Sequence, residues 1–243
     1  MTNDLTKDLD YIPPWRSALP DRPLTGLTVL VVEDSRFASE AVRLLCLRSG
    51  ARIRRADTIR AALRHLQTYR PGAIIVDMGL PDGDGADMIR TIALASPRVP
   101  VILGISGDAS RREAALTAGA DGFIAKPIEN LALFQQTILN ALPAEDRPCG
   151  VRSLPNEVIV PDRTALRDDL THVAEVLAMA DDIAAIEYIA RFLAGVARSA
   201  HDAPLEHAAS ALASAPRAGG SLAVDLARIS GMVQDRLSAV QGL

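Results

Sequence analysis

The first half of the chain alternates strand-like runs with amphipathic segments. The strand-like runs lie at residues 27–32, 52–56, 73–77, 99–105 and 122–125, and the second of them is the least apolar. Apolar residues three and four positions apart then predict helices at residues 35–48, 58–69, 84–95, 110–118 and 129–142. Five strand–helix units in succession predict an α/β fold, in which helices cover both faces of a doubly wound, five-stranded parallel sheet.

The second half of the chain, from Pro161 onward, has helical periodicity throughout. Four apolar stripes at helical spacing are separated by breaks at Asp181 and at residues 201–204 and 215–220. Four amphipathic helices joined by short connections predict a small antiparallel four-helix bundle.

These patterns predict two domains. We expect the α/β domain over residues 25–142 and the all-α bundle over residues 162–243. Residues 143–161 contain four prolines and no long periodicity, so we expect a linker, with residues 156–160 as a candidate extended piece. Residues 1–24 also contain four prolines and are expected to form a flexible tail.

Composition and charge argue against several classes of function. The 243 residues carry a formal net charge of −4, so the chain lacks the basic balance typical of nucleic-acid binding. No apolar run approaches the ~20 residues that a membrane helix needs, and the N-terminal residues lack the pattern of a secretory signal. Cys46 and Cys149, the only cysteines, form no zinc motif, and we expect a reducing, cytoplasmic location.

Three acidic residues are expected at one edge of the predicted sheet. Glu33 and Asp34 follow the first strand, and Asp77 ends the third. The carboxyl ends of parallel strands meet at one edge, where open α/β sheets bind their ligands. Converging carboxylates raise one another's pKa unless a cation joins them. A site made only of oxygen ligands suits Mg²⁺, which keeps several of its waters and often bridges to phosphate.

A hydroxyl and an ammonium group are expected at the same edge. Ser106 ends the fourth strand and Lys126 ends the fifth, so both could hold oxygens of a phosphoryl group on Asp77. Lys126 is one of only two lysines beside 24 arginines, and a compact ammonium acts as a point charge where arginine is a wide fork. The alternative is that these polar residues merely cap the strand ends.

Together these residues resemble the receiver domain of two-component response regulators. The resemblance covers about residues 25–142. It rests on Glu33-Asp34, on Asp77 within Asp77-Met78-Gly79-Leu80-Pro81-Asp82-Gly83-Asp84-Gly85, on Ser106-Gly107 and on Lys126-Pro127.

The resemblance implies that Asp77 accepts a phosphoryl group from a phosphohistidine. The implied Mg²⁺ ligands are Glu33, Asp34, Asp77 and the carbonyl of Gly79. Ser106 would move toward the phosphoryl group, and Phe123 occupies the position of the aromatic residue that rotates inward behind it. A plain core role for Phe123 is the alternative. Such a protein is no enzyme beyond catalysing its own phosphorylation and dephosphorylation.

The helical half resembles the histidine phosphotransfer domain, a four-helix bundle that presents a histidine in a His-x-Leu-Lys-Gly pattern. Asp182 lies nine residues before Arg191, as an aspartate precedes the histidine in that family. Leu193 and Gly195 match the pattern, whereas Arg191 replaces the histidine and Ala194 replaces the lysine. The resemblance therefore implies a degenerate domain that does not relay phosphate through residue 191.

One face of the second bundle helix is a candidate surface for binding a partner. The face carries Ala184, Glu187, Arg191, Ala194 and Arg198 by helical spacing, away from the apolar stripe. Ala194 and Gly195 are small, which leaves room for another protein to approach this surface. The alternative is an ordinary solvated face with a Glu187–Arg191 pair worth a few tenths of a kcal/mol.

The leading hypothesis is a phosphorelay regulator without DNA-binding output. From Pro161 onward there are seven arginines, no lysine and eleven acidic residues, a poor match for a phosphate backbone. We expect protein partners, above all the phosphotransfer helices or the receiver of a sensor or hybrid histidine kinase, which this protein inhibits or modulates. The alternatives are a relay or sink that uses His172, His201 or His207, a transcriptional regulator, and a self-associating module.

Overall fold

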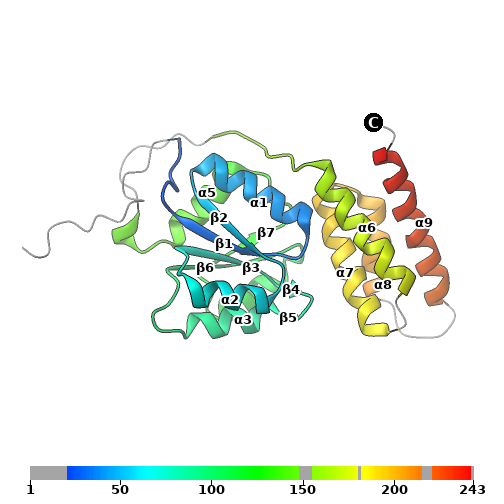
Figure 1. Cartoon of the computed structure of the whole chain (residues 1–243), viewed down its shortest axis with the longest axis horizontal. Coiled ribbons are helices and arrows are strands. Elements are labelled where there is room, and N and C mark those ends of the chain that lie inside the picture. Colours follow the sequence, from blue (N-terminus) through cyan, green and yellow to red (C-terminus); the bar gives the residue numbers. More distant parts are fainter. Residues whose placement is uncertain (1–20, 148–154, 180–181, 215–220, 242–243) are drawn as a thin grey trace, which may run out of the picture.

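The computed structural model describes residues 21–147, 155–179, 182–214 and 221–241, which form an α/β domain and a bundle of helices (Figure 1). A parallel sheet of five strands lies at the centre of the α/β domain, in the order β2-β1-β3-β6-β7. The strands are β1 (Thr28–Val32), β2 (Arg52–Ala56), β3 (Ala73–Asp77), β6 (Val101–Ser106) and β7 (Gly122–Ala125). The predicted doubly wound sheet is confirmed.

Helices cover both faces of this sheet because its strands are apolar on both sides. In β1, Val29 and Val31 pack into one buried cluster and Leu30 and Val32 into the other. The first cluster is closed by α1 (Arg36–Ser49) and α5 (Leu131–Ala141). The second is closed by α2 (Ile59–Thr68), α3 (Gly85–Ala93) and α4 (Arg111–Thr117).

Local signals in the sequence set the ends of helix α1. Ser35 caps its N-terminus, where the side-chain oxygen accepts a hydrogen bond from the amide of Ala38 at 3.0 Å. Gly50 ends the helix with φ of 82°, a left-handed conformation that glycine adopts at little cost. This cap places the acidic residues before Ser35 directly at the end of the sheet.

The C-terminal half forms the predicted bundle of four helices. They are α6 (Arg163–Met179), α7 (Ile183–Ser199), α8 (Ala203–Ser214) and α9 (Ser221–Gln241). Each helix contacts two others, because α6 packs on α7 and α9, and α8 packs on the same two helices. The core between them includes the fully buried side chains of Val173, Ile189, Ala209 and Val233. In Figure 1 the bundle lies beside one end of the sheet, and α6 and α7 both contact α1.

Part of the predicted linker is attached to the α/β domain. The amide of Leu131 donates to the carbonyl of Glu157 at 3.1 Å, and the amide of Ile159 donates to the carbonyl of Glu129 at 2.8 Å. The extended piece expected at residues 156–160 therefore forms a short bridge along the start of α5.

At the other end of the chain, Leu24 is buried in the core, although the tail was expected to reach this residue. Residues 1–20 of that tail lie outside the described residues.

A pair of short strands and one 3-10 turn were not predicted. The loop after β3 contains an antiparallel pair of two-residue strands, β4 (Gly79–Leu80) and β5 (Gly83–Asp84). A single 3-10 turn, η2 (Ala144–Asp146), follows α5. Elements of this length show no periodicity in a sequence, so only the glycine- and aspartate-rich composition of the loop marked the first of them.

Candidate functional site

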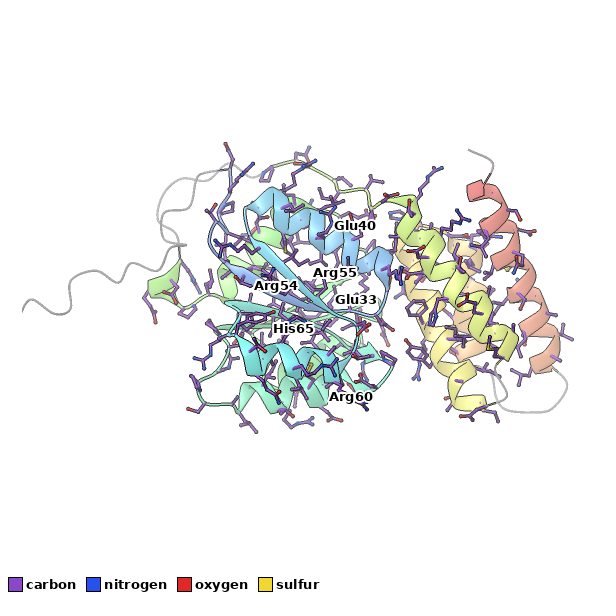
Figure 2. The ribbon with its side chains drawn as sticks, in the orientation of Figure 1. Glu33, Glu40, Arg54, Arg55, Arg60 and His65 are labelled. Atoms are coloured by element: carbon purple, nitrogen blue, oxygen red, sulfur yellow. The ribbon has the colours of Figure 1, made fainter. Side chains whose placement is uncertain are left out.

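Three carboxylates meet at the carboxyl end of the sheet, as the strand-end argument predicts. Glu33 follows β1, where its amide donates to the carbonyl of Ala56 at 2.9 Å and extends the pairing with β2. Asp34 is next in the chain, and Asp77 is the last residue of β3. One oxygen of each carboxylate lies within 4.8 Å of those of the other two. Figure 2 shows Glu33 at the end of the sheet that faces the bundle.

Lys126 supplies the only positive charge that directly contacts these carboxylates in the described chain. Its Nζ lies 2.7 Å from Oε2 of Glu33 and 2.8 Å from Oδ1 of Asp77. The lysine follows β7, and its amide donates to the carbonyl of Ser106 at 2.9 Å, which fixes it beside β6. Its side chain is 8% exposed, so little solvent screens these two contacts.

Burial and mutual repulsion shift the pKa values of the acidic groups. Burial raises the pKa of Glu33 well above its ordinary value, against the attraction of Lys126. Burial also raises the pKa of Asp34 to about 6, against the hydrogen bond from Tyr188. For Lys126, burial would lower the pKa, but Asp77 and Glu33 more than reverse this and raise it. Lys126 is therefore charged at neutral pH, and a further cation at the cluster would favour the ionised forms of Glu33 and Asp34.

The donor set fits Mg²⁺ rather than a softer metal. It consists of carboxylate oxygens alone, which hard divalent cations prefer. Oε2 of Glu33 is buried and has no hydrogen-bond partner of good geometry among the described residues, although it lies close to Lys126. The site therefore offers a buried oxygen and excess negative charge, and both suit a bound cation.

The loop after β3 holds the Asp77 carboxylate. The amide of Gly79 donates to Oδ2 of Asp77 at 2.8 Å. The role expected for the carbonyl of Gly79 as a metal ligand stays a prediction. Gly85 starts α3 so close to β3 that a Cβ at this position would lie 2.0 Å from the carbonyl oxygen of Asp77. Only glycine permits this approach, so the loop sequence fixes the distance between α3 and the end of β3.

Arg111 is a residue of the site that sequence reasoning missed. This side chain reaches from α4 to the loop after β3, where it contacts the carbonyl of Met78 at 3.0 Å and both carboxylate oxygens of Asp84 at 2.6 Å. An arginine at a helix start gives no signal of such a contact in a single sequence.

Ser106 and Phe123 lie on the neighbouring strands β6 and β7, and Ser106 lines the cavity that contains the acidic cluster. Ser106 ends β6 and is half-buried, and its Oγ accepts a hydrogen bond from the amide of Asp108 at 3.1 Å. Phe123 lies on β7, is half-buried, and packs against the second sheet cluster. The functional roles expected for Ser106 and Phe123 stay predictions.

A cavity of about 780 Å³ lies between the acidic edge and the bundle. From the α/β domain it is lined by Glu33, Asp34, Asp77, Ser106, Arg111 and Lys126, among others. From α7 it is lined by Ala184, Arg191, Ala194 and Arg198 of the face expected to bind a partner, and by Gly195. Glu187, the remaining residue of that face, is not among the lining residues. Arg191 is exposed, whereas Ala194 is buried and also belongs to the bundle core. Glu187 is half-buried on the same helix. The candidate partner surface is therefore turned toward the acidic edge of its own chain.

Asp169 of α6 joins the two domains at the start of α1. It accepts hydrogen bonds from Oγ of Ser35 at 2.7 Å and from the amides of Arg36 and Phe37 at 2.9 and 3.0 Å. Asp169 is 2% exposed. Burial raises its pKa, against the hydrogen bonds from Phe37 and Ser35. Its position between Leu166 and Leu170 of the apolar stripe was the one signal of this role in the sequence.

Helix α7 contributes further contacts between the domains. The hydroxyl of Tyr188 donates to Oδ2 of Asp34, and the guanidinium of Arg198 donates to the carbonyl of Gly107. Just beyond α7, Nε2 of His201 lies 2.5 Å from Oε1 of Glu129. Sequence reasoning missed Tyr188 as a residue of the site.

The three histidines of the bundle do not line the cavity that contains Asp77. His172, His201 and His207 are all exposed. His172 packs edge-on against Phe192, and His201 faces Glu129. None of them is positioned to exchange a phosphoryl group with Asp77 in this arrangement.

Comparison with known proteins identifies the α/β domain. Residues 29–138 match the family described as "Response regulator receiver domain". The KDP operon transcriptional regulatory protein KdpE of Escherichia coli is 37% identical over 99 residues, which are 41% of this chain and 44% of KdpE. The virulence transcriptional regulatory protein PhoP of Salmonella typhimurium is 30% identical over 116 residues, or 46% of this chain and 52% of PhoP.

Among solved structures, one match is the receiver domain of the sensor histidine kinase PA1611 from Pseudomonas aeruginosa. It is 28% identical, covers 46% of this chain and 93% of that domain, and has a TM-score of 0.41. In that structure a magnesium ion is coordinated in the active site cleft.

The N-terminal half of this chain is therefore a response regulator receiver domain. The chain spans about half the length of the curated relatives it matches. No described helix combines the length and the apolar character needed to cross a membrane.

Proposed function

We propose that this protein is a phosphorelay regulator whose receiver accepts a phosphoryl group on Asp77. The observation that carries the proposal is the position of Lys126, whose ammonium lies between Asp77 and Glu33 in a cluster of three carboxylates. An ammonium at this point neutralises charge that develops on a transferred phosphoryl group.

The residues of the site have distinct tasks in this transfer. An oxygen of Asp77 attacks the phosphorus of a phosphohistidine and forms a P–O bond while the P–N bond breaks. Glu33, Asp34, Asp77 and the carbonyl of Gly79 would hold Mg²⁺, which would supply positive charge for the transfer. Lys126 and Ser106 bind further oxygens of the group. Phe123 rotates inward as Ser106 moves, which carries the change to the face around α4 and β7.

A phosphorylation assay tests the assignment of Asp77. We expect the full chain to become labelled by a small phosphodonor such as acetyl phosphate in the presence of Mg²⁺, and Asp77→Asn to abolish the label. Asp87→Asn is the matched control, because Asp87 is an exposed acidic residue of α3 that pairs with Arg90. Label that persists in Asp77→Asn, or that needs no divalent cation, contradicts the proposal.

We further propose that the output of this receiver is a protein contact made by the bundle. The relatives named above are transcriptional regulators, but the matches cover only 41% and 46% of this chain, and the region after Pro161 is acidic. Acidic surfaces bind the phosphate backbone poorly. The face of α7 around Arg191 already packs toward the acidic edge of a receiver, so the receiver of a hybrid histidine kinase is the partner that this chemistry fits.

The experiment for this output follows labelled phosphate on a hybrid histidine kinase with and without the full chain, in the reducing conditions of the cytoplasm. A loss of label from the kinase, with no acid-labile phosphate on the bundle, supports modulation. Asp77→Ala separates a phosphate sink, which needs Asp77, from inhibition by occupancy. Label on His172, His201 or His207 would instead show a working relay, and binding to DNA would show a transcriptional regulator.

A further inference from the structure

Both carboxylate oxygens of Asp34 are already engaged in the described structure. Oδ1 accepts a hydrogen bond from the amide of Ser35 at 3.1 Å. Oδ2 accepts a hydrogen bond from the hydroxyl of Tyr188, which lies 154 residues away on α7. The first bond is local to the receiver, whereas the second exists only while the bundle lies against the receiver.

The Tyr188 hydroxyl occupies an oxygen of Asp34, one of the three carboxylates that would hold a metal ion. Tyr188 lines the cavity that also contains Glu33, Asp34 and Asp77. Mg²⁺ demands octahedral geometry and keeps several waters, so its shell requires room beside the carboxylates. The Tyr188 hydroxyl donates a hydrogen bond to Oδ2 of Asp34 and brings no positive charge to it. A neutral donor on Oδ2 cannot replace the charge that a metal ion brings.

We infer that Tyr188 is a latch, through which the docked bundle competes with the metal ion for Asp34. The inference rests on the proposed function of the acidic cluster as the metal site. Because coupling between two sites is reciprocal, docking that weakens metal binding is itself weakened by the metal to the same extent. Phosphorylation of Asp77, which needs the metal, therefore favours release of α7 and exposes its inner face.

A second contact couples the bundle to the same site. Arg198 donates to the carbonyl of Gly107, the residue directly after Ser106. Ser106 is the residue expected to move toward the phosphoryl group, so its movement disturbs the Arg198 contact. Asp169, by contrast, holds α6 at the start of α1 and contacts none of the three carboxylates of the cluster through the hydrogen bonds described. Asp169 therefore offers a way to weaken docking without changing the metal ligands.

The test is a calorimetric titration of the full chain with Mg²⁺. We expect Tyr188→Phe to bind Mg²⁺ about tenfold more tightly than wild type, the effect of one hydrogen bond to a charged group. Tyr69→Phe is the matched control, since the buried Tyr69 hydroxyl has no hydrogen-bond partner among the described residues, and it should bind as wild type does. Asp169→Ala should also tighten Mg²⁺ binding, because it loosens the bundle from a different point.

Amide exchange provides a readout that does not depend on phosphorylation. The amides of Arg36 and Phe37 donate to Asp169 only in the docked state, so their exchange rates, measured by NMR, report docking. We expect Mg²⁺ to speed their exchange in the wild type. Unchanged Mg²⁺ affinity in both Tyr188→Phe and Asp169→Ala, or exchange that Mg²⁺ does not alter, overturns the latch.

The outcomes separate the latch from the proposed function. If Asp77 is phosphorylated but neither variant changes Mg²⁺ binding, the latch is wrong and the proposed function stands. If Tyr188→Phe tightens Mg²⁺ binding and Mg²⁺ speeds exchange but Asp77 accepts no phosphoryl group, the latch stands and the proposed function is wrong. A wild-type chain and a Tyr188→Phe variant that both bind no Mg²⁺ overturn both.

Discussion

Replacement of Lys126 by methionine tests the electrostatic balance on which the site depends. The substitution keeps an unbranched side chain of similar length and removes the charge. Two contacts are lost, at 2.7 Å to Glu33 and 2.8 Å to Asp77. Three carboxylates then remain within 4.8 Å of one another without this cation.

The size of the effect follows from the distances and the burial. At an effective dielectric constant of about 20, each contact contributes an attraction of about 6 kcal/mol. Burying the ammonium costs several kcal/mol, which offsets much of this attraction. Removal of one partner from a buried ion pair typically costs about 3–5 kcal/mol, because the remaining charge is left uncompensated. We expect Lys126→Met to lower the free energy of unfolding of the receiver by that amount at pH 7.5.

Urea unfolding followed by circular dichroism measures this loss. Mg²⁺ should restore part of the stability of Lys126→Met, because the ion supplies the missing positive charge. Glu33→Gln in the Lys126→Met background should also restore stability, since it removes one of the uncompensated carboxylates. A loss below about 1 kcal/mol, the range of exposed ion pairs, or a loss that neither Mg²⁺ nor Glu33→Gln reduces, would refute this reasoning.

Three further predictions follow from the packing and the charges. Asp169→Ala should weaken docking of the bundle by about 2–3 kcal/mol. Asp168→Ala breaks only an exposed ion pair and should weaken docking by less than about 1 kcal/mol. Limited proteolysis between the domains distinguishes the two variants. Burial raises the pKa of Asp34 to about 6 in the folded protein. The contribution of Asp34 to stability is therefore fully present below the pKa that this carboxyl has in the unfolded chain, and it is lost as the pH rises through about 6. When the pH falls from about 7.5 to 5.5, the melting temperature of the metal-free protein should therefore rise, whereas the extra stability that Mg²⁺ provides should decrease. If both quantities rise or both fall over this range, the prediction is wrong. Gly85→Ala should destabilise the receiver by about 2 kcal/mol or more in urea unfolding, whereas Gly231→Ala, with nothing within 4 Å, should stabilise α9 by about 0.5–1 kcal/mol.

The sheet and most helices could be predicted because their signals are local. The apolar run at residues 73–77 is long enough to show burial on both faces, and β3 occupies the same residues. Ser35, Thr58 and Asn130 each cap the helix that they precede. In the loop after β3, the two-residue strands are too short to produce a pattern in the sequence.

The candidate site could be predicted to the extent that the sheet places its residues. Glu33, Asp77 and Lys126 come together because parallel strands end at one edge. Tyr188 and Asp169 could not be assigned from periodicity, since they reach the site from more than 130 residues away. A contact over such a distance depends on how two domains meet, and no spacing rule within one helix describes it.

The face of α7 around Arg191 cannot bind the receiver of its own chain and another protein at the same time. While Tyr188 is bonded to Asp34 and Arg198 to Gly107, that face covers the acidic edge of its own receiver. We propose that the receiver of a kinase binds this same face of α7 around Arg191. The receiver within the chain therefore competes with the kinase receiver for that face. A competitor in the same chain is present at high effective concentration and is displaced only when its own affinity falls. Metal binding and phosphorylation at Asp77 lower that affinity through Asp34, which is why the state of one carboxylate cluster can control whether the bundle is free to act on another protein.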